Sequence, residues 1–197
     1  AINAHMHLMA AIRIAMTGHA GAIFPTLRTA LEYACYAFLI TDDPALAAVW
    51  TNRHDSREAL KASRSAFTSA VKATTRKLNE IQPNSADWIS DAYDVAIDFG
   101  GHPNPRGVFT HVSWGEETDS HLAMNIAGLY AADQFETTRS LIACLDFTLA
   151  VAVVLTRCRK EFSETIQNEI NALNDRKESV ISELIKMGAI GARERDP

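Results

Sequence analysis

Residues 131–159 contain neither glycine nor proline and are rich in alanine and leucine. Nothing in this stretch ends a helix, so the sequence predicts one long helix here. Its most apolar part, residues 141–156, is shorter than the run of about 20 apolar residues that spans a bilayer, and it contains Asp146. We therefore expect a helix buried almost completely at the centre of a soluble domain, with no membrane association.

Other long segments also repeat apolar residues at helical spacing, and clusters of glycine and proline separate them. The predicted helices cover residues 1–17, 24–40, 45–52, 56–81, 87–100 and 162–187. The predicted fold class is therefore all-α: a single bundle of about five to seven helices with an irregular Gly/Pro-rich loop near residues 100–115. A minor β element at "FTHVSW" and the residues after it stays open, because their period does not separate strand from helix.

The chain divides into a helical core, residues 1–160, and an amphipathic C-terminal helix, residues 161–190. The apolar residues of that helix step alternately by four and three, with Lys177 in the one apolar slot that is polar. This stripe predicts a homodimer or larger assembly, since an apolar stripe must be covered. The alternative is that the helix packs back on its own domain. The stripe consists of Ile166, Ile170, Leu173, Val180, Leu184 and Met187.

Composition restricts the compartment and the partners. Apolar residues make up 47% of the chain and charged residues 22%, as in soluble globular proteins. The net charge of −5 gives no global positive field for nucleic acid, so RNA binding would need a local basic patch. The only candidate for that patch is the helix with Arg57, Lys61, Arg64 and Lys72. Three widely spaced cysteines without a CxxC pair are typical of a reducing cytoplasm, where we expect the protein to be.

Charged residues in apolar helical segments are the first candidate site. Arg28 and Glu32 are four residues apart and share a helix face, and Asp146 is alone in its apolar run. Charges in such surroundings must be paired or must face a cleft, because burying them alone is costly. The three residues either form internal ion pairs that fix helix register or line a polar pocket that binds a ligand.

The corner that follows the predicted helix over residues 87–100 is the second candidate site. Asp98, His102, Arg106 and His111 lie within "DFGGHPNPRGVFTH", where glycine and proline restrict the backbone. We expect His102 and Arg106 to point toward the bundle and meet carboxylates, so that the segment closes one end of the bundle as a polar lid. The alternative is an ordinary connection in which both side chains extend into water.

Neither a metal site nor a cofactor is predicted. A di-iron bundle needs Glu-x-x-His steps on two helices, and the sequence contains none. His5, His7 and His19 are more simply explained as chance histidines near a chain end than as metal ligands.

Two resemblances bear on function. "RGVFTH", residues 106–111, resembles the Arg-x-x-x-x-His motif of HEPN domains, small helical bundles that are often homodimeric ribonucleases of defence and toxin systems. This resemblance implies an RNA-cleaving centre at Arg106 and His111. "LRTALEYACYAFLITDDPALAAVW" and "DFGGHPNP" are similar to segments of uncharacterised bacterial all-helical families, which implies a fold but no activity.

Three classes of function remain. The leading hypothesis is a helical interaction or ligand-binding protein with a regulatory role in a bacterial defence or stress system. The first alternative is a HEPN-like, metal-independent ribonuclease that uses Arg106 and His111. The second is an enzyme that acts on a small molecule with the Arg28, Glu32 and Asp146 cluster.

Overall fold

The fold is all-α, as predicted. The computed structural model describes residues 1–101, 104–117, 121–159, 161 and 163–188. Seven of the described helices have ten residues or more, in agreement with the predicted five to seven. The elements are α1 (Ile2–Met16), α2 (Ala20–Asp42), α3 (Ala45–Thr51), α4 (Arg57–Phe67), α5 (Ala70–Asn79), α6 (Pro83–Ala96), the π-helical turn η1 (Ile97–Gly101), α7 (Pro105–Phe109), β1 (Val112–Glu117), β2 (Leu122–Ile126), α8 (Phe135–Thr156) and α9 (Glu164–Lys186).

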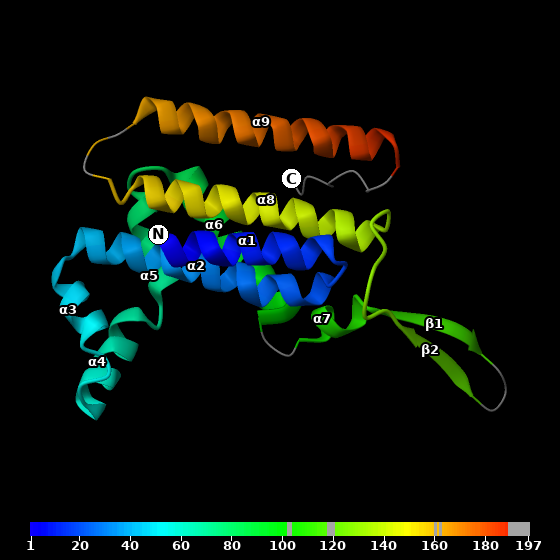
Figure 1. Cartoon of the computed structure of the whole chain (residues 1–197), viewed down its shortest axis with the longest axis horizontal. Helices are drawn as coiled ribbons and strands as arrows, with labels where there is room; N and C mark the ends of the chain where they lie inside the picture. The colour runs from blue at the N-terminus through cyan, green and yellow to red at the C-terminus, as the bar shows by residue number, and fades with distance from the viewer. Residues whose placement is uncertain (102–103, 118–120, 160, 162, 189–197) are drawn as a thin grey trace.

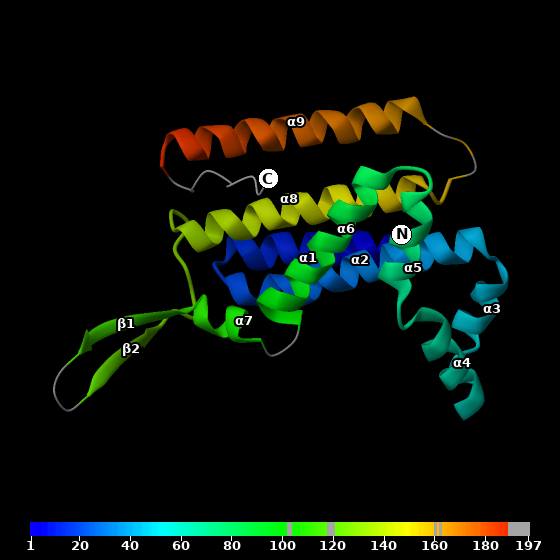
Figure 2. The ribbon, with the colours of Figure 1, turned by 180° about the vertical axis from the view of Figure 1, so that it is seen from behind.

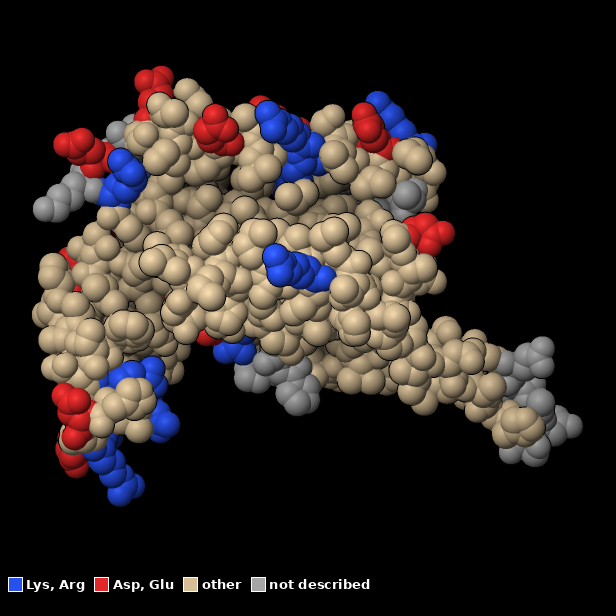
Figure 3. Space-filling model, in the orientation of Figure 1, with Lys and Arg blue, Asp and Glu red and all other residues tan. Residues whose placement is uncertain are grey.

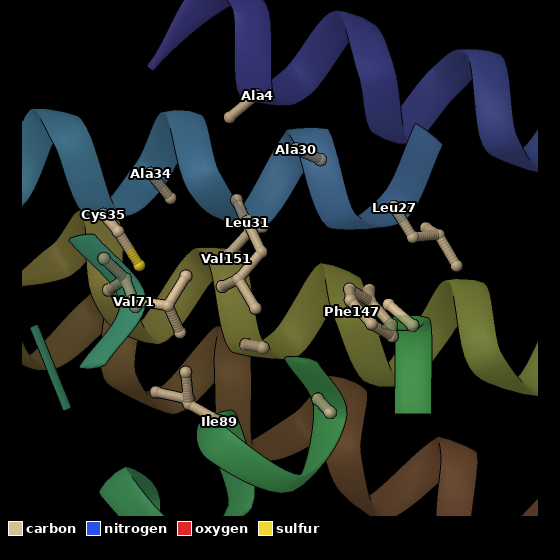
Figure 4. Close-up of a cluster of buried hydrophobic side chains, with 14 of the residues drawn as sticks. Ala4, Leu27, Ala30, Leu31, Ala34, Cys35, Val71, Ile89, Phe147 and Val151 are labelled. Carbon is tan, nitrogen blue, oxygen red and sulfur yellow. The ribbon is translucent and has the colours of Figure 1, made fainter. Parts of the chain in front are cut away.

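The core lies where α1, α2, α5, α6 and α8 meet (Figures 1 and 2). Small residues let α1 and α2 approach closely: Ala4 and Ala11 on α1 and Ala30 and Ala34 on α2 are fully buried. Larger side chains fill the space between α2, α8 and the shorter helices (Figure 4). They are Leu27, Leu31, Val71, Ile89, Phe147 and Val151.

The central helix is less buried than the sequence predicts. Leu149 is 2% exposed, but Leu141 is 36% exposed and Leu145 is half-buried. Near-complete burial of residues 141–156 is therefore wrong, because α8 lies beside α1 in an outer layer of the bundle and one of its sides faces solvent (Figure 1). Among the described helices, α8 alone has the length and composition to cross a membrane, and 39% of its most apolar stretch is buried inside the structure.

The predicted helix over residues 56–81 is also wrong in one respect, because the structure divides it into α4 and α5. Ser69 leaves helical geometry at φ −114° and ψ 34°. On α4 only Ser63 and Phe67 are buried, whereas α5 buries half of its residues. With so little apolar surface to bury, α4 turns away from the bundle, and only its C-terminal end is held there by Phe67 stacking on Tyr36.

The open question at "FTHVSW" is settled by a two-stranded antiparallel sheet. β1 and β2 pair with Val112 opposite Ile126 and Trp114 opposite Met124. This hairpin projects from the bundle beyond α7 in both views (Figures 1 and 2).

The C-terminal helix α9 lies along α8 of the same chain (Figure 1). Ser163 caps its N-terminus by accepting a hydrogen bond from the Ile166 N–H. Lys177 and Ile181 are its buried residues, whereas Val180, from the predicted stripe, is 47% exposed. The predicted stripe is therefore buried at Lys177, but the next buried position is Ile181 instead of Val180. A hollow of about 550 Å³ remains between the N-terminal half of α9 and α8.

Candidate functional site

The predicted pair on α2 is present and is joined by a third residue from α6. Arg28 Nε donates a hydrogen bond to Glu32 Oε1 at 2.9 Å, and Tyr93 Oη donates to the same oxygen at 3.0 Å. The Arg28 guanidinium also lies 5.5 Å from the centroid of the Tyr93 ring. These three contacts fix the Glu32 carboxylate at the contact between α2 and α6.

The charges of this network reinforce one another. Partial burial by itself would lower the pKa of Arg28, but the hydrogen bond and charge of Glu32 outweigh it, and the pKa is raised. Burial raises the pKa of Tyr93, and the Glu32 charge raises it further. The guanidinium therefore stays charged and the phenol stays protonated, so both remain hydrogen-bond donors to Glu32 at physiological pH.

Glu32 also lines a cavity that continues into an apolar hollow. The first part has a volume of about 210 Å³ and is walled by Tyr33, Tyr36 and Trp50, with Thr29, Glu32 and Arg53. The second part, of about 390 Å³, shares the three aromatic residues and adds Ile2, Ala37 and Ile40 among its lining residues. We call the two parts together the aromatic cleft. It lies between the start of α1, the middle of α2 and the end of α3.

Two polar groups of the aromatic cleft have unused hydrogen-bonding capacity. Arg53 Nε is buried without a hydrogen-bond partner among the described residues. Both hydrogen bonds to Glu32 end on Oε1, and within the described part of the chain Oε2 accepts none. The Tyr36 hydroxyl lies within electrostatic reach of both groups: burial raises its pKa, Glu32 raises it further and Arg53 lowers it. The cleft thus offers one donor and one acceptor on an aromatic wall.

Asp146 is paired at a different place. Its Oδ1 accepts a hydrogen bond from Lys177 Nζ at 2.7 Å, between α8 and α9, and Lys177 is 5% exposed. Arg28 and Glu32, by contrast, meet Tyr93 of α6. The three predicted pocket residues therefore belong to two sites, one between α2 and α6 and one between α8 and α9.

The polar corner is assembled in part. Arg106 Nη1 lies 2.5 Å from Asp98 Oδ2, and Asn104 Nδ2 donates to Asp98 Oδ1 at 3.0 Å. The Arg106 side chain is nevertheless 70% exposed, so its ion pair lies at the surface rather than inside the bundle. His102, which we expected to meet a carboxylate, lies outside the described residues.

His111 ties the base of the hairpin to the bundle. Its Nδ1 lies 2.7 Å from Tyr130 Oη, and the Tyr130 N–H donates to the Gly18 carbonyl at 3.1 Å. Gly18 has φ +79°, and a Cβ there would lie 2.1 Å from the Tyr130 carbonyl oxygen, so only glycine fits. Arg106 and His111 thus have separate partners, Asp98 and Tyr130.

The predicted basic helix stands apart from this corner. Arg57, Lys61 and Arg64 line one hollow on α4, whereas Lys72 lines another on α5, since the two helices diverge. In both views α4 and α7 occupy different parts of the molecule (Figures 1 and 2). The basic residues of α4 and Arg106 on α7 therefore do not form one continuous basic patch for a phosphate backbone.

Cys35 and Cys144 are buried thiols. Burial raises the pKa of the Cys35 and Cys144 thiols to about 12, so neither is a thiolate at neutral pH. Within the described ranges no three His, Cys, Asp or Glu side chains are grouped so as to hold a metal ion. His7 stacks on Tyr33 instead, with ring centroids 5.5 Å apart.

Comparison of the chain with protein-family models, with curated proteins and with solved structures finds no match. The site therefore has to be interpreted from its own geometry. The sequence does not indicate Arg53 or Tyr93 as site residues, since neither is near Arg28 or Glu32 in the chain. The sequence feature that could have indicated this cleft is Trp50, an aromatic residue that follows the Asp–Pro break after α2 and marks a second apolar contact there.

Proposed function

We propose that the chain is a helical ligand-binding protein whose binding site is the aromatic cleft. The observation that carries this proposal is the partnerless, buried Nε of Arg53 beside Glu32 in a cavity with three aromatic walls. Leaving a guanidinium N–H buried and unpaired is costly, and a site that binds a ligand recovers this cost when the ligand supplies the acceptor.

The chemistry of the cleft defines the ligand class. Arg53 calls for an acceptor or an anionic group, and Glu32 Oε2 calls for a hydrogen-bond donor or a cation. The walls of Tyr33, Tyr36 and Trp50 favour an aromatic or apolar body between these two groups. A small molecule with a donor and an acceptor on such a body fits, as in an amino acid or a nucleobase. Arg28 and Tyr93 hold Glu32 through Oε1, which supports a fixed binding group that offers Oε2 to a ligand.

The test uses thermal-shift and tryptophan-fluorescence titrations of the whole chain with free amino acids, nucleobases and nucleosides. We expect at least one of these classes to raise the melting temperature and to change the emission of Trp50. Arg53→Met keeps the apolar stem but removes the donor, and it should weaken binding by about 10- to 100-fold, as loss of a charge-assisted hydrogen bond does. Glu32→Gln should weaken the binding of ligands with a cationic donor by a similar factor.

The matched control is Arg57→Met, which removes an equal charge from α4 outside the aromatic cleft. It should bind the probe like the wild type. The proposal fails if no class of probe shifts the melting temperature, or if Arg53→Met binds as tightly as Arg57→Met.

The ribonuclease alternative is favoured by one observation. Arg106 lies in the short helix α7 and its side chain is 70% exposed, so it is accessible to a phosphate. The test is cleavage of a single-stranded RNA by the wild type, His111→Ala and Arg57→Met. Cleavage that is lost only in His111→Ala would favour the ribonuclease over the ligand-binding protein. Because His111 also holds Tyr130, the melting temperature of His111→Ala must be measured beside its activity.

A further inference from the structure

The β1–β2 hairpin has an apolar face that no described residue of its own chain covers. Side chains directly opposite in an antiparallel pair share a face, so Trp114 lies beside Met124 and Val112 beside Ile126. Leu122 follows on the same face by alternation along β2. Trp114, Met124 and Ile126 are 64%, 52% and 68% exposed. The other face carries the small or polar residues Ser113, Gly115, Ala123 and Asn125.

This exposure is unfavourable for the hairpin. A two-stranded hairpin alone is at best marginally stable in water and needs packing against its apolar face. The base of this one is fixed to the bundle through Tyr130 and Gly18, but its strands project away from the helices in both views (Figures 1 and 2). The hairpin is therefore an anchored arm that its own core does not support.

A second uncovered apolar face lies on α1 and α8. Along α1 the exposed residues Ile2, Met6, Met9, Arg13 and Met16 step by four and three, the spacing of a helix contact seam. Arg13 is the only Lys, Arg, Asp or Glu residue of α1. On α8, which packs beside α1, Leu141 is also exposed. Figure 3 shows a broad surface over these two helices almost free of charged side chains, which gather instead along α9 and α4.

We propose that two copies of the chain form a dimer in which the hairpin of each copy lies on the α1–α8 face of the other. Each copy supplies one apolar arm and one apolar receiving face. The arm of the first copy contacts the face of the second, and the arm of the second contacts the face of the first, so the assembly closes as a dimer. The arm points away from its own α1–α8 face, so another chain must receive it.

Charge favours a second copy over other occupants of these surfaces. Two glutamates, residues 116 and 117, end β1 on the arm, whereas the receiving face carries the cation Arg13. The second copy thus supplies both the apolar surface and the opposite charge.

The test is the mass of the full chain in solution, by light scattering at micromolar concentration. The wild type should be a dimer. Trp114→Ser/Ile126→Ser in the arm and Met6→Glu/Met9→Glu in the receiving face should each weaken the dimer by about a hundredfold or more, because each removes two large apolar contacts per half-interface. Asn125→Ser, on the polar face of the same arm, and Met187→Glu, at a more exposed methionine directly after α9, should remain dimeric.

A mixing experiment distinguishes arm exchange from a symmetric contact between two α1–α8 faces. The arm variant keeps an intact receiving face, and the face variant keeps an intact arm. An equimolar mixture of the two should therefore form a heterodimer through one intact contact, although each variant alone is monomeric. In a symmetric face-to-face dimer the arm variant alone would remain dimeric.

Folding is checked independently of association. Each variant should keep the helical circular dichroism of the wild type, and in the wild type the amides of β1 and β2 should exchange faster on dilution into the monomer. A monomeric wild type, a dimer that the arm variant does not weaken, or binding of the wild type to phosphatidylcholine vesicles as a monomer would each overturn the proposal. So would hairpin exchange rates that do not depend on concentration.

Discussion

Tyr93 contributes to the site through one hydrogen bond, and its size can be measured. Its hydroxyl donates to the Glu32 carboxylate, which is also bonded to Arg28. Tyr93→Phe keeps the ring under the Arg28 guanidinium but removes the donor, so we expect the free energy of unfolding to fall by about 0.5–1.5 kcal/mol. The matched control is Tyr33→Phe, whose hydroxyl makes no hydrogen bond in the described part of the chain. Equal losses in the two variants would contradict a specific role for Tyr93.

Lys177 is the buried cation of the α8–α9 contact. It pairs with Asp146, and the two side chains are 5% and 21% exposed. Lys177→Met should lower the free energy of unfolding by about 2 kcal/mol, less than for a fully buried pair because Asp146 keeps some contact with water. Chemical denaturation measures this loss, and Lys186→Met, at the exposed end of α9, should cost almost nothing.

The double variant Asp146→Leu/Lys177→Met distinguishes the pair from its surroundings. With both charges gone, the half-buried Asp146 carboxylate no longer lacks its partner, and only the exposed Glu178, 3.0 Å from Lys177 Nζ in the wild type, loses one. The double variant should therefore be more stable than Lys177→Met alone. Losses that simply add would show that the two residues act independently.

Single residues were predicted from the sequence only where the partner is local. Arg28 and Glu32 follow from their four-residue spacing, since a helix places such side chains on one face. Tyr93 is 61 residues away from Glu32, and its position depends on how α6 docks on α2. The sequence also marked Lys177 as a polar residue in an apolar stripe, but only the packing of α9 on α8 explains it as the partner of Asp146.

Among the elements, α4 should depend most on its cap. Ser56 has an extended backbone, and its hydroxyl accepts a hydrogen bond from the Ala59 N–H at 3.0 Å. Because α4 has few core contacts, Ser56→Ala should weaken this helix by about 1 kcal/mol, and its amides should exchange about fivefold faster. Ser65→Ala, an exposed change in the middle of α4, should leave exchange unchanged or slow it. A uniform increase over the whole bundle would contradict a local effect.

Element boundaries were predictable where turn residues mark them. The Asp–Pro break after α2 and the Gln–Pro break before α6 agree with the structure to within a few residues. The interruption between α4 and α5 carries neither glycine nor proline, and Phe67 and Val71 continue one apolar stripe across it. The break comes from tertiary packing: α5 is held against α2 and α6, whereas α4 has only its last turn to bury.

For the whole molecule, the sequence predicted the class of fold but not the layer in which each helix lies. Residues 141–156 are apolar on every side except at Asp146, so their composition alone predicts a helix surrounded by others. In the structure α1 also carries apolar residues on its outward side, and the two helices share a surface with few charged side chains. Helical periodicity identifies apolar surfaces. It does not predict which of them is buried within the chain and which is left for a partner.

The pH dependence of global stability follows from the buried thiols. Burial raises the pKa of Cys35 and of Cys144 from 9.0 to about 12. An acid whose pKa is higher in the folded state holds its proton more tightly there, so its contribution is fully present below pH 9.0 and is lost as the pH rises toward about 12. Unfolding should therefore become easier in alkali, and each thiol should cost about 1.4 kcal/mol by about pH 10.

Urea denaturation in the presence of a reductant, from about pH 8 to about pH 10.5, measures this slope. Cys35→Ala removes one of the titrating groups and should make the loss of stability with pH shallower, whatever it does to stability at pH 8. Cys158→Ala is the matched variant: the Cys158 thiol is only partly buried, so removing it should flatten the curve less. The tyrosines contribute at still higher pH, because burial also raises the pKa of Tyr36 and Tyr93 from 10.0. If Cys35→Ala and the wild type lost stability in parallel across this range, the Cys35 thiol would ionise as readily in the folded chain as in the unfolded one. That result would contradict the effect of burial on the pKa of this thiol.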